Sequence, residues 1–269
     1  MTKISAFIIT KNEEKLIAIA INSLKELTDE IILVDSGSTD NTVKIAKDLG
    51  AKVYLNEWKG YVEQKSFAEK LCQHDWILNI DADEELSPKL KNEIKELCQS
   101  SKLDNSEFYA YKINLVIMHR TDRKIRPFAP SNCVIRFYNR RYCSFANSKI
   151  NTTHDSVMFN PDINQENKIG TFKNIGYHRS FVSLEQQIAK ANFYSSEQAK
   201  DMLKNKRIPS RLRIIAELPF FFFKVYFLRR YFIFGFDGFV DSAVCAFRRF
   251  IRLAKARELV KLTNSDNQH

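Results

Sequence analysis

The sequence predicts an α/β fold built on a mostly parallel sheet, and three observations lead to this prediction. Short apolar runs alternate with helix-forming segments through the first hundred residues. Three of these runs end in polar residues, at Thr10, at Asp35 and at 81–83, as strands do where ligands bind beyond their carboxyl ends. The last third of the chain has the residue spacing of long helices. We therefore expect a sheet with right-handed crossovers, followed by a helical extension.

The elements of the first hundred residues follow from apolar spacing and from capping residues. We predict strands at 5–10, 30–34, 51–55 and 76–80. We predict helices at 13–27, 42–49, 62–73 and 89–98. The first helix has apolar residues three and four positions apart, and the turn at 36–41 offers cap residues for the second. Ser87 followed by Pro88 is a typical beginning for the fourth helix.

The second half of the chain has a different pattern. Residues alternate between apolar and polar at 108–117, 133–138 and 171–178, which predicts three further strands. We expect them to form an antiparallel addition that makes the other wall of a crevice. From residue 183 onward we predict helices at 184–203, 211–234 and 240–262, with a hinge at 235–238.

Two carboxylates follow the fourth predicted strand. Asp81 and Asp83 are two positions apart, so in an extended segment their side chains point to the same side. Crowded carboxylates repel unless a cation lies between them, and all-oxygen ligands suit Mg²⁺ or Mn²⁺. Such an ion is well placed to hold a diphosphate. The alternative is an ordinary solvated turn. A phosphatase of the haloacid dehalogenase type is disfavoured, because Glu85 stands where that class needs threonine.

Three segments, in their order and spacing, resemble family-2 glycosyltransferases of the GT-A fold: 8–14 (IITKNEE), 32–40 (ILVDSGSTD) and 79–84 (NIDADE). Three shorter segments resemble the bacterial lipopolysaccharide-core β-glucosyltransferase subgroup: 58–60 (WKG), 64–66 (QKS) and 235–238 (GFDG). The resemblance implies a mixed, Rossmann-like sheet of the nucleotide-diphospho-sugar transferase type with a C-terminal helical extension. The implied domains are a catalytic domain at 1–180, with a nucleotide-sugar half at 1–100 and an acceptor half at 101–180, and an extension at 181–269.

The resemblance also implies a set of site residues. The nucleotide-sugar site would comprise Thr10, Asn12, Glu13, Asp35, Ser38, Gln64, Lys65, Asp81 and Ala82. Asp35 would contact the uracil or the ribose, and Asp81, Asp83 and His178 would be the metal ligands, with Asp83 the firmest of the three. Each has a plainer alternative: Asp35 as a helix cap, Gln64 and Lys65 on an exposed helix face, and His178 as a structural histidine.

Glycosyl transfer also needs a base, because the acceptor hydroxyl loses a proton as it attacks the anomeric carbon. Our candidate is Asp155, which lies in the acceptor half, downstream of the metal motif. The subgroup often carries a His-Glu pair there, and this chain has His154 followed by the shorter Asp155. Glu84 and Glu85 are the fallback, and Asp155 as an ordinary loop acid is the alternative.

The net charge of +10 lies in one segment of the chain. Residues 204–261 hold 14 Lys and Arg against 4 Asp and Glu, whereas the remainder is balanced, and 11 aromatic residues fall within 220–239. No uncharged stretch approaches the roughly 20 residues of a membrane span. The composition suits a helix on an anionic membrane surface. The alternatives are a helix packed on the catalytic domain and a nucleic-acid-binding surface, which we do not expect.

We therefore predict an inverting, metal-dependent hexosyltransferase that uses Mn²⁺ or Mg²⁺. It would move a hexose such as glucose from a UDP-linked donor to a lipopolysaccharide core or another lipid-linked glycan. The five scattered cysteines and the short apolar segment at 4–9 favour a cytoplasmic protein, peripheral on the inner face of the cytoplasmic membrane. One rival is a sugar-phosphate nucleotidylyltransferase, although no glycine-rich loop follows the first strand. The other is a non-enzymatic adaptor for membranes or nucleic acid.

Overall fold

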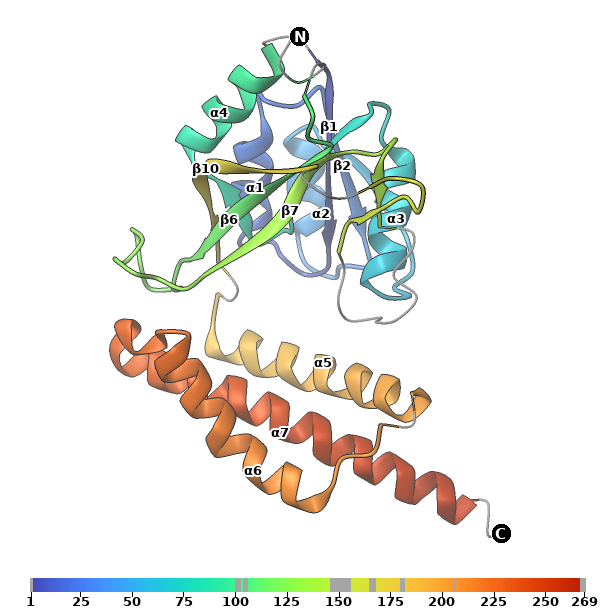
Figure 1. Ribbon diagram of the computed structural model, residues 1–269, viewed down its shortest axis with the longest axis vertical. Coiled ribbons are helices and arrows are strands. Elements are labelled where there is room, and N and C mark those ends of the chain that lie inside the picture. Colours follow the sequence, from blue (N-terminus) through green and yellow to red (C-terminus); the bar gives the residue numbers. More distant parts are fainter. Residues whose placement is uncertain are drawn as a thin grey trace. The chain divides into compact units, whose positions relative to one another are not determined.

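The computed structural model describes residues 2–99, 103, 106–145, 156–164, 168–179, 182–205 and 207–266. Contacts within the chain separate two compact units. Unit 1 holds the described residues of 1–117, 131–150 and 154–180, and unit 2 holds those of 118–130 and 181–269. Each unit is described by itself (Figure 1).

Unit 1 is built on one mixed sheet of eight strands. In spatial order they are β3 (Lys52–Leu55), β2 (Glu30–Asp35), β1 (Ile4–Thr10), β4 (Trp76–Asn79), β7 (Ser131–Asn139), β6 (Ala110–Ile117), β10 (Ile169–His178) and β5 (Glu84–Leu86). The first four are parallel to one another. β7 is antiparallel to β4 and β6, β10 is parallel to β6, and β5 is antiparallel to β10. The three strands predicted in the second half therefore extend the same sheet, and the expected antiparallel arrangement is wrong for β10, which is parallel to β6. β5 was not predicted, because three residues are too few to show a period.

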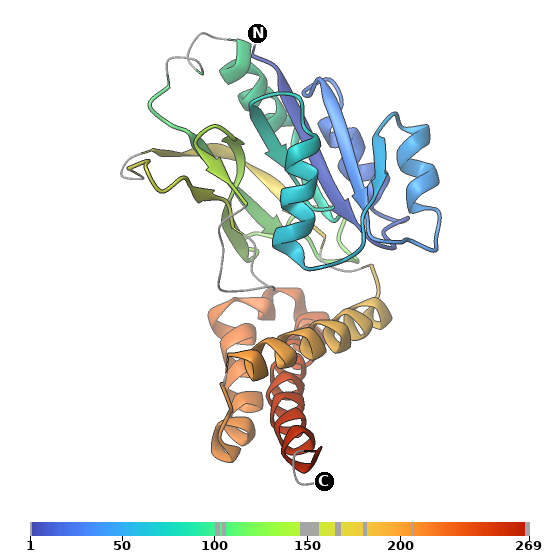
Figure 2. The same ribbon diagram turned by 90° about the vertical axis from the view of Figure 1, so that its right-hand side faces the viewer.

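Helices cover both faces of this sheet. α1 (Ile17–Leu24), α2 (Thr42–Asp48) and α4 (Pro88–Gln99) contribute to the core on one face. α3 (Tyr61–Leu71) and the small pair β8 (Cys143–Ser144) and β9 (Met158–Phe159) contribute to the core on the other. Figures 1 and 2 show α4 and α3 on opposite sides of the sheet. Unit 1 is thus a layered α/β structure with an apolar core on each face.

Two of these helices show how local sequence sets their beginnings. The Ser87 hydroxyl accepts a hydrogen bond from the Leu90 N–H at 3.2 Å, which caps α4 as predicted. α1 begins at Ile17 rather than at residue 13. The backbone N–H of Glu13 donates instead to Thr42 Oγ1 at 2.8 Å, and Asn12 has a left-handed φ of 55°. Residues 11–14 are therefore held by the β2–α2 turn and not by a helix.

The sheet register brings three polar strand ends to one edge. Thr10 at the end of β1 pairs with Asp35 at the end of β2, and Phe7 of β1 pairs with Asn79, the last residue of β4. Because these strands are parallel and adjacent, their carboxyl ends lie side by side. The segment that carries Asp81 and Asp83 begins directly beyond β4.

Unit 2 contains α5 (Leu184–Lys204), α6 (Arg211–Phe223), the π-helical η1 (Lys224–Leu228), the 3₁₀ turn η2 (Tyr231–Phe234) and α7 (Gly235–Asp266). α7 packs against both α5 and α6. The prediction of one helix at 211–234 is wrong, because Arg230 adopts a left-handed φ of 60° and ends the helical run. Of the predicted hinge at 235–238, only Gly235 breaks the helical path, with a φ of 63°, and residues 236–238 belong to the first turn of α7. Within the described residues, no helix has the length and apolarity needed to cross a bilayer.

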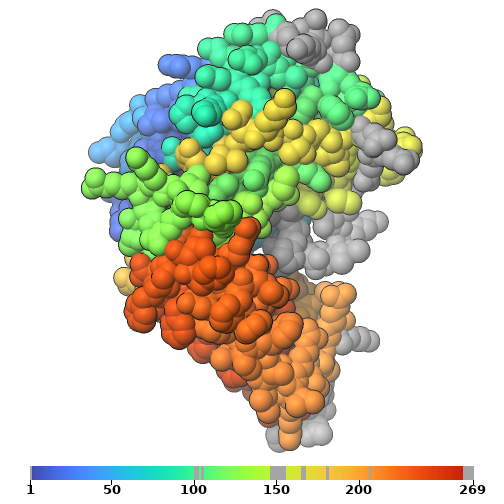
Figure 3. Space-filling model, turned by 60° about the vertical axis from the view of Figure 1, so that its left-hand side comes forward, coloured from blue at the N-terminus to red at the C-terminus, as the bar shows by residue number. Residues whose placement is uncertain are grey.

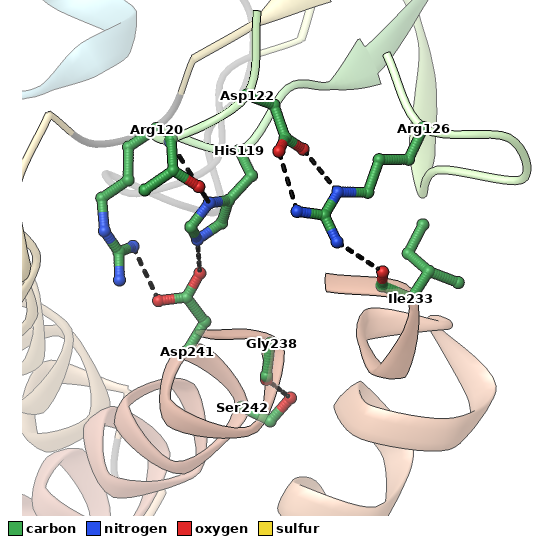
Figure 4. A network of polar contacts seen from close by, with 9 residues as sticks. His119, Arg120, Asp122, Arg126, Ile233, Gly238, Asp241 and Ser242 are labelled. Carbon is green, nitrogen blue, oxygen red and sulfur yellow. Dashed lines mark hydrogen bonds and ion pairs between the residues drawn. The ribbon is translucent and has the colours of Figure 1, made fainter. Parts of the chain in front are cut away.

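A polar network joins the segment 118–130 to α7 and η2 (Figure 4). His119 Nε2 lies 3.3 Å from Asp241 Oδ2, and Arg120 Nη1 donates to Asp241 Oδ1 at 2.8 Å. Arg126 donates to the carbonyl of Ile233 at 2.8 Å. Asp241 is buried, so its two cationic or polar neighbours compensate the loss of water around its charge. These contacts tie the chain between β6 and β7 into the helical unit.

Candidate active site

The carboxylate of Asp81 is held on both sides by cationic side chains. Asp81 Oδ1 lies 2.8 Å from Lys65 Nζ of α3, and Asp81 Oδ2 accepts from Arg136 Nη2 of β7 at 2.6 Å. Arg136 also donates to Glu84 Oε1 and, at 3.1 Å, to Asn79 Oδ1. The Asp81 N–H donates to Glu84 Oε2 at 3.0 Å. The end of β4 is therefore organised around one buried guanidinium and one buried ammonium.

The surrounding charges set the protonation of the two acids. Burial by itself would raise the pKa of Asp81, but Arg136 and Lys65 outweigh it and hold that pKa well below its usual range. Burial raises the pKa of Glu84, and the charge of Asp81 adds to this increase while Arg136 opposes it. Asp81 thus stays ionised between its two cations. Lys65 is fully buried, so it does not lie on an exposed helix face.

Asp83 and His178 form a second pair at this edge. His178 Nε2 lies 3.4 Å from Asp83 Oδ2, and the N–H of Arg179 donates to the Asp83 carbonyl at 2.8 Å. Burial would lower the pKa of His178, but Asp83, Glu84 and Asp81 raise it to about 9. Asp83 and His178 thus form an ion pair, and His178 would have to lose its proton before its imidazole could bind a metal ion.

No cluster of three or more His, Cys, Asp and Glu side chains with metal-binding geometry occurs in the described part of the chain. Asp83 and His178 thus offer two donors, one carboxylate and one imidazole, a combination that Mn²⁺ accepts. A diphosphate and water would have to supply the other ligands. Both oxygens of Asp81 are bonded to cations here, so its predicted role as a metal ligand stays a prediction.

A tight turn at the end of β2 gathers the predicted nucleoside-binding residues. Asp35 Oδ2 accepts from the N–H groups of Gly37 and Ser38, both at 2.8 Å, and the Ser38 hydroxyl donates to Asp35 Oδ1. The Asn12 N–H donates to Ser38 Oγ at 2.8 Å, and Asn12 Oδ1 accepts from the Thr39 N–H at 2.8 Å. Asp35 thus stabilises its own turn, and the two hydrogen bonds of Asn12 connect this turn to the loop after β1.

α3 joins these two parts of the site through consecutive residues. Gln64 Nε2 donates to Ser36 Oγ at 2.9 Å, and Gln64 Oε1 accepts from Asn56 Nδ2 at 2.8 Å. The next residue, Lys65, contacts Asp81. One turn of α3 therefore contacts the carboxyl ends of β2, β3 and β4. Both side chains are fully buried, so the alternative that they lie on an exposed helix face is wrong.

The other predicted site residues have simple placements. Thr10 is buried at the end of β1, and among the described residues its hydroxyl has no hydrogen-bond partner. Glu13 is buried, and Ala82 belongs to the apolar core. The proposed base, Asp155, lies outside the described residues, as does His154. Their functional roles stay predictions.

Arg136 was missed by the sequence reasoning. It lies in the apolar stretch Val134–Tyr138, and a charged residue between aliphatic and aromatic neighbours in a predicted strand was the available signal. The sequence does not identify its partners, because Arg136 reaches the end of β4 only through the long-range pairing of β7 with β4. Asn79 and Glu84 were likewise not assigned to the donor site.

Comparison with known proteins defines the class. Residues 5–180 match the family described as Glycosyl transferase family 2, so this protein belongs to that family. The predicted fold class, a GT-A mixed sheet with a C-terminal helical extension, is confirmed. The chain is 58% identical over 96% of its length to an uncharacterized glycosyltransferase of Rickettsia bellii, covering 87% of that protein. It is 29% identical to the lipopolysaccharide core biosynthesis glycosyltransferase LpsC of Rhizobium meliloti, over 94% and 91% of the two chains.

The chain also matches two solved structures, both with TM-scores below 0.5. Glucosyl-3-phosphoglycerate synthase from Mycobacterium tuberculosis, in complex with Mn²⁺, UDP-glucose and phosphoglyceric acid, matches with 27% identity and a TM-score of 0.34. That match covers 45% of each chain, so it spans less than half of the solved protein. TarS 1–349 of S. aureus matches over 98% of this chain and 92% of its own, with 17% identity and a TM-score of 0.47.

Proposed function

We propose that this family-2 enzyme transfers a hexose, with inversion, from a UDP-linked donor to a lipopolysaccharide core or another lipid-linked glycan, and that it needs a divalent metal ion. One observation carries the proposal. Two buried cations and a carboxylate–imidazole pair meet at the carboxyl end of β4, beside the turn fastened by Asp35. A nucleotide-sugar donor would place its nucleoside at the Asp35 turn and its diphosphate beside the two cations and the carboxylate–imidazole pair.

Each part of the site has a task in this reaction. The turn of Asp35 and Ser38 would receive the nucleoside, and Asp83 with His178 would hold the metal, which neutralises charge on the leaving diphosphate. Lys65 and Arg136 add fixed positive charge beside it, and Asp81 keeps both side chains in place. Asp155 would accept the proton of the attacking hydroxyl. Because Lys65 and Arg136 are already held in place by Asp81, these two cations need little rearrangement when the diphosphate leaves.

The acceptor class rests on similarity. LpsC is named as a lipopolysaccharide core biosynthesis enzyme, and it is similar to this chain over nearly its whole length. A lipid-linked acceptor lies at a membrane, so we also propose that the enzyme works as a peripheral protein on the inner face of the cytoplasmic membrane. The basic and aromatic segment 204–261 supports this location through its charge and composition.

Calorimetric titration of the full chain with a panel of nucleotide-sugars, with and without Mn²⁺, tests the proposal. We expect a UDP-hexose to bind, and to bind more tightly when Mn²⁺ is present. Asp83→Asn should remove the metal effect, whereas Asp48→Asn, a change in α2 outside the site, should leave it intact. Absence of binding by every nucleotide-sugar, with or without metal, would reject the proposal. A metal effect that persists in Asp83→Asn would reject the role of Asp83.

A further inference from the structure

α6 exposes a stripe of apolar side chains, whereas its one acidic side chain is buried. Leu212 is 76% exposed, Ile215 71% and Phe223 56%, whereas Glu217 is only 8% exposed. The exposed apolar positions include Pro219, so the spacing 212, 215, 219, 223 follows one side of the helix. A helix packed on a water-soluble unit normally turns such a stripe inward. Here the stripe faces outward.

The inner side of α6 buries two side chains within unit 2, the acid Glu217 and the aromatic Phe221. Glu217 Oε1 accepts from Arg249 Nε of α7 at 2.8 Å, and the guanidinium of Arg249 lies 4.8 Å from the ring centre of Phe221. Burial lowers the pKa of the nearby Arg252 to about 10, and Arg252 bonds to Gln198 of α5 at 3.2 Å. The inward orientation of Glu217 is thus fixed by an ion pair. Rotating α6 to bury the apolar stripe would break that pair and expose Phe221.

The stripe continues beyond α6 into a broader apolar surface. Phe220 lies beside the stripe in α6, and the exposed members beyond α6 are Phe227, Leu228, Phe232 and Phe236. The segment from α6 into α7, orange to red in Figure 3, forms an outer surface of unit 2. An exposed apolar surface of this kind marks an interaction site.

The charges around this surface favour one kind of partner. From residue 211 to residue 236 the exposed charged side chains are all basic, at 211, 213, 224, 229 and 230, and Glu217 is the single acid in that segment. A second copy of the chain would bring like charges together across a two-fold interface. An anionic bilayer instead offers phosphate groups to the cations and an acyl boundary to the aromatic and aliphatic side chains.

We infer that the outward stripe of α6, with its continuation to Phe236, inserts into the interface of an anionic membrane while its flanking arginine and lysine side chains bind lipid headgroups. This inference deepens the proposed function, because it identifies the surface that would bring the enzyme to a membrane-bound acceptor. It requires no transmembrane helix. The side chains of the stripe enter the headgroup region, while Glu217, in its ion pair with Arg249, stays buried on the opposite side of α6.

Vesicle flotation of the full chain tests this inference. Wild-type protein should float with phosphatidylcholine vesicles that contain about 30% phosphatidylglycerol, and much less with pure phosphatidylcholine. The double variant Ile215→Ser/Phe223→Ser should lose at least about tenfold in vesicle affinity. The matched control is Ile188→Ser/Phe193→Ser, which removes the same two residue types from exposed positions of α5 and should bind as wild type. Circular dichroism and thermal unfolding should be alike for all three proteins.

Three outcomes would overturn the inference. The first is equal flotation of the α6 variant and the wild type, and the second is failure of the wild type to float with either vesicle. The third is a dimer in sedimentation velocity that only the α6 variant loses, which would assign the surface to a second copy. Calorimetry with UDP-glucose on the same proteins separates this result from the proposed function. A wild type that binds UDP-glucose but does not float rejects only the membrane surface. A wild type that floats but binds no nucleotide-sugar rejects only the transferase proposal.

Discussion

Arg136 Nη2 lies 2.6 Å from Asp81 Oδ2, although 55 positions separate the two residues in the sequence. The contact exists because β7 enters the sheet antiparallel to β4 and directly beside it. An arginine from the second half of the chain therefore completes the end of a strand from the first half. The acidic motif after β4 is consequently not a cluster of uncompensated carboxylates, and the site has cations of its own before any metal binds.

Removing Arg136 should destabilise unit 1 strongly. Arg136→Ala leaves Asp81 and Glu84 without their shared guanidinium, and breaking a buried pair costs about 3–5 kcal/mol. Urea unfolding measures the change. The control Arg141→Ala removes an exposed partner of Asp75 and should cost at most about 1 kcal/mol. Arg136→Lys should fall between the two variants, and equal stability of Arg136→Ala and Arg141→Ala would contradict the role described here.

His178 should govern metal affinity rather than folding. If Asp83 and His178 share an ion, His178→Ala weakens Mn²⁺ binding in the presence of UDP by at least about tenfold. Titration followed by electron paramagnetic resonance of free Mn²⁺ measures this directly. His74→Ala, which changes a histidine just before β4, serves as the control. Unchanged affinity in His178→Ala would exclude the imidazole as a ligand.

Asp155 should affect the chemical step and not donor binding. Asp155→Asn keeps the size of the side chain but cannot accept a proton, so kcat should fall by about 10²- to 10⁴-fold while the affinity for UDP-glucose stays near that of the wild type. Steady-state kinetics together with calorimetry separate the two effects. Asp162→Asn, at an exposed position nearby in the sequence, should leave kcat unchanged. A normal kcat in Asp155→Asn would return Glu84 and Glu85 to consideration.

Glu30 should make stability depend on acid pH. Its carboxylate accepts from Ser5 Oγ and from the Gln73 N–H, both at 2.6 Å, and lies 2.9 Å from Lys52 Nζ. Burial would raise the pKa of Glu30, but these partners lower it overall. A carboxyl whose pKa is lowered on folding contributes stability above its unfolded pKa, and that contribution is lost as the pH falls through its folded pKa.

Glu30→Gln should therefore be less stable than the wild type at pH 7, by about 1.5–3 kcal/mol, and the difference should shrink as the pH falls below about 4. Thermal unfolding between neutral and acid pH gives both curves. Glu26→Gln, at an exposed position in the same part of the chain, should follow the wild type throughout. Parallel curves for Glu30→Gln and wild type, separated by a constant amount, would show that ionisation of Glu30 is not the cause.

Gly238 should tolerate no side chain. A Cβ atom there would lie 1.9 Å from the carbonyl oxygen of Tyr231, which is backbone and cannot rotate away. We expect Gly238→Ala to cost about 3 kcal/mol or more. Gly235→Ala meets no atom within 4 Å and is opposed only by its backbone, whose φ of 63° and ψ of −136° favour glycine, so about 1–3 kcal/mol is expected. Chemical denaturation of both variants checks the order, and the reverse order would mean that η2 can shift away from α7.

The sequence predicted most of the helices and strands whose apolar pattern lies within the element itself. The apolar runs that became β1, β2 and β4 were predicted within one or two residues, because buried parallel strands are continuously apolar. The break between η1 and η2 was not predicted. Aromatic residues continue through it, so hydrophobic periodicity gave no sign that Arg230 would adopt a left-handed conformation.

The candidate site was predicted only in part, for a related reason. Asp81, Asp83 and Asp35 could be found because each directly follows an apolar strand, which is a local signal. Lys65 was assigned to the donor site from the family resemblance, but its contact with Asp81 depends on how α3 packs on the sheet. The contact of Arg136 with Asp81 likewise depends on the order of the strands in the sheet. Long-range pairing of this kind leaves no trace in residue spacing.

The adjacency of Gln64 and Lys65 limits how this chain can vary in length. Gln64 bonds to residues just after β2 and β3, and Lys65 bonds to Asp81 just after β4. A shift of α3 by one position would therefore break all three contacts. An added or deleted residue in the loop 56–60, which connects β3 to α3, would disturb all three contacts if it shifted α3 along the sheet. We therefore expect an insertion or deletion in this loop to weaken the site, although the loop contains neither acid of the metal motif.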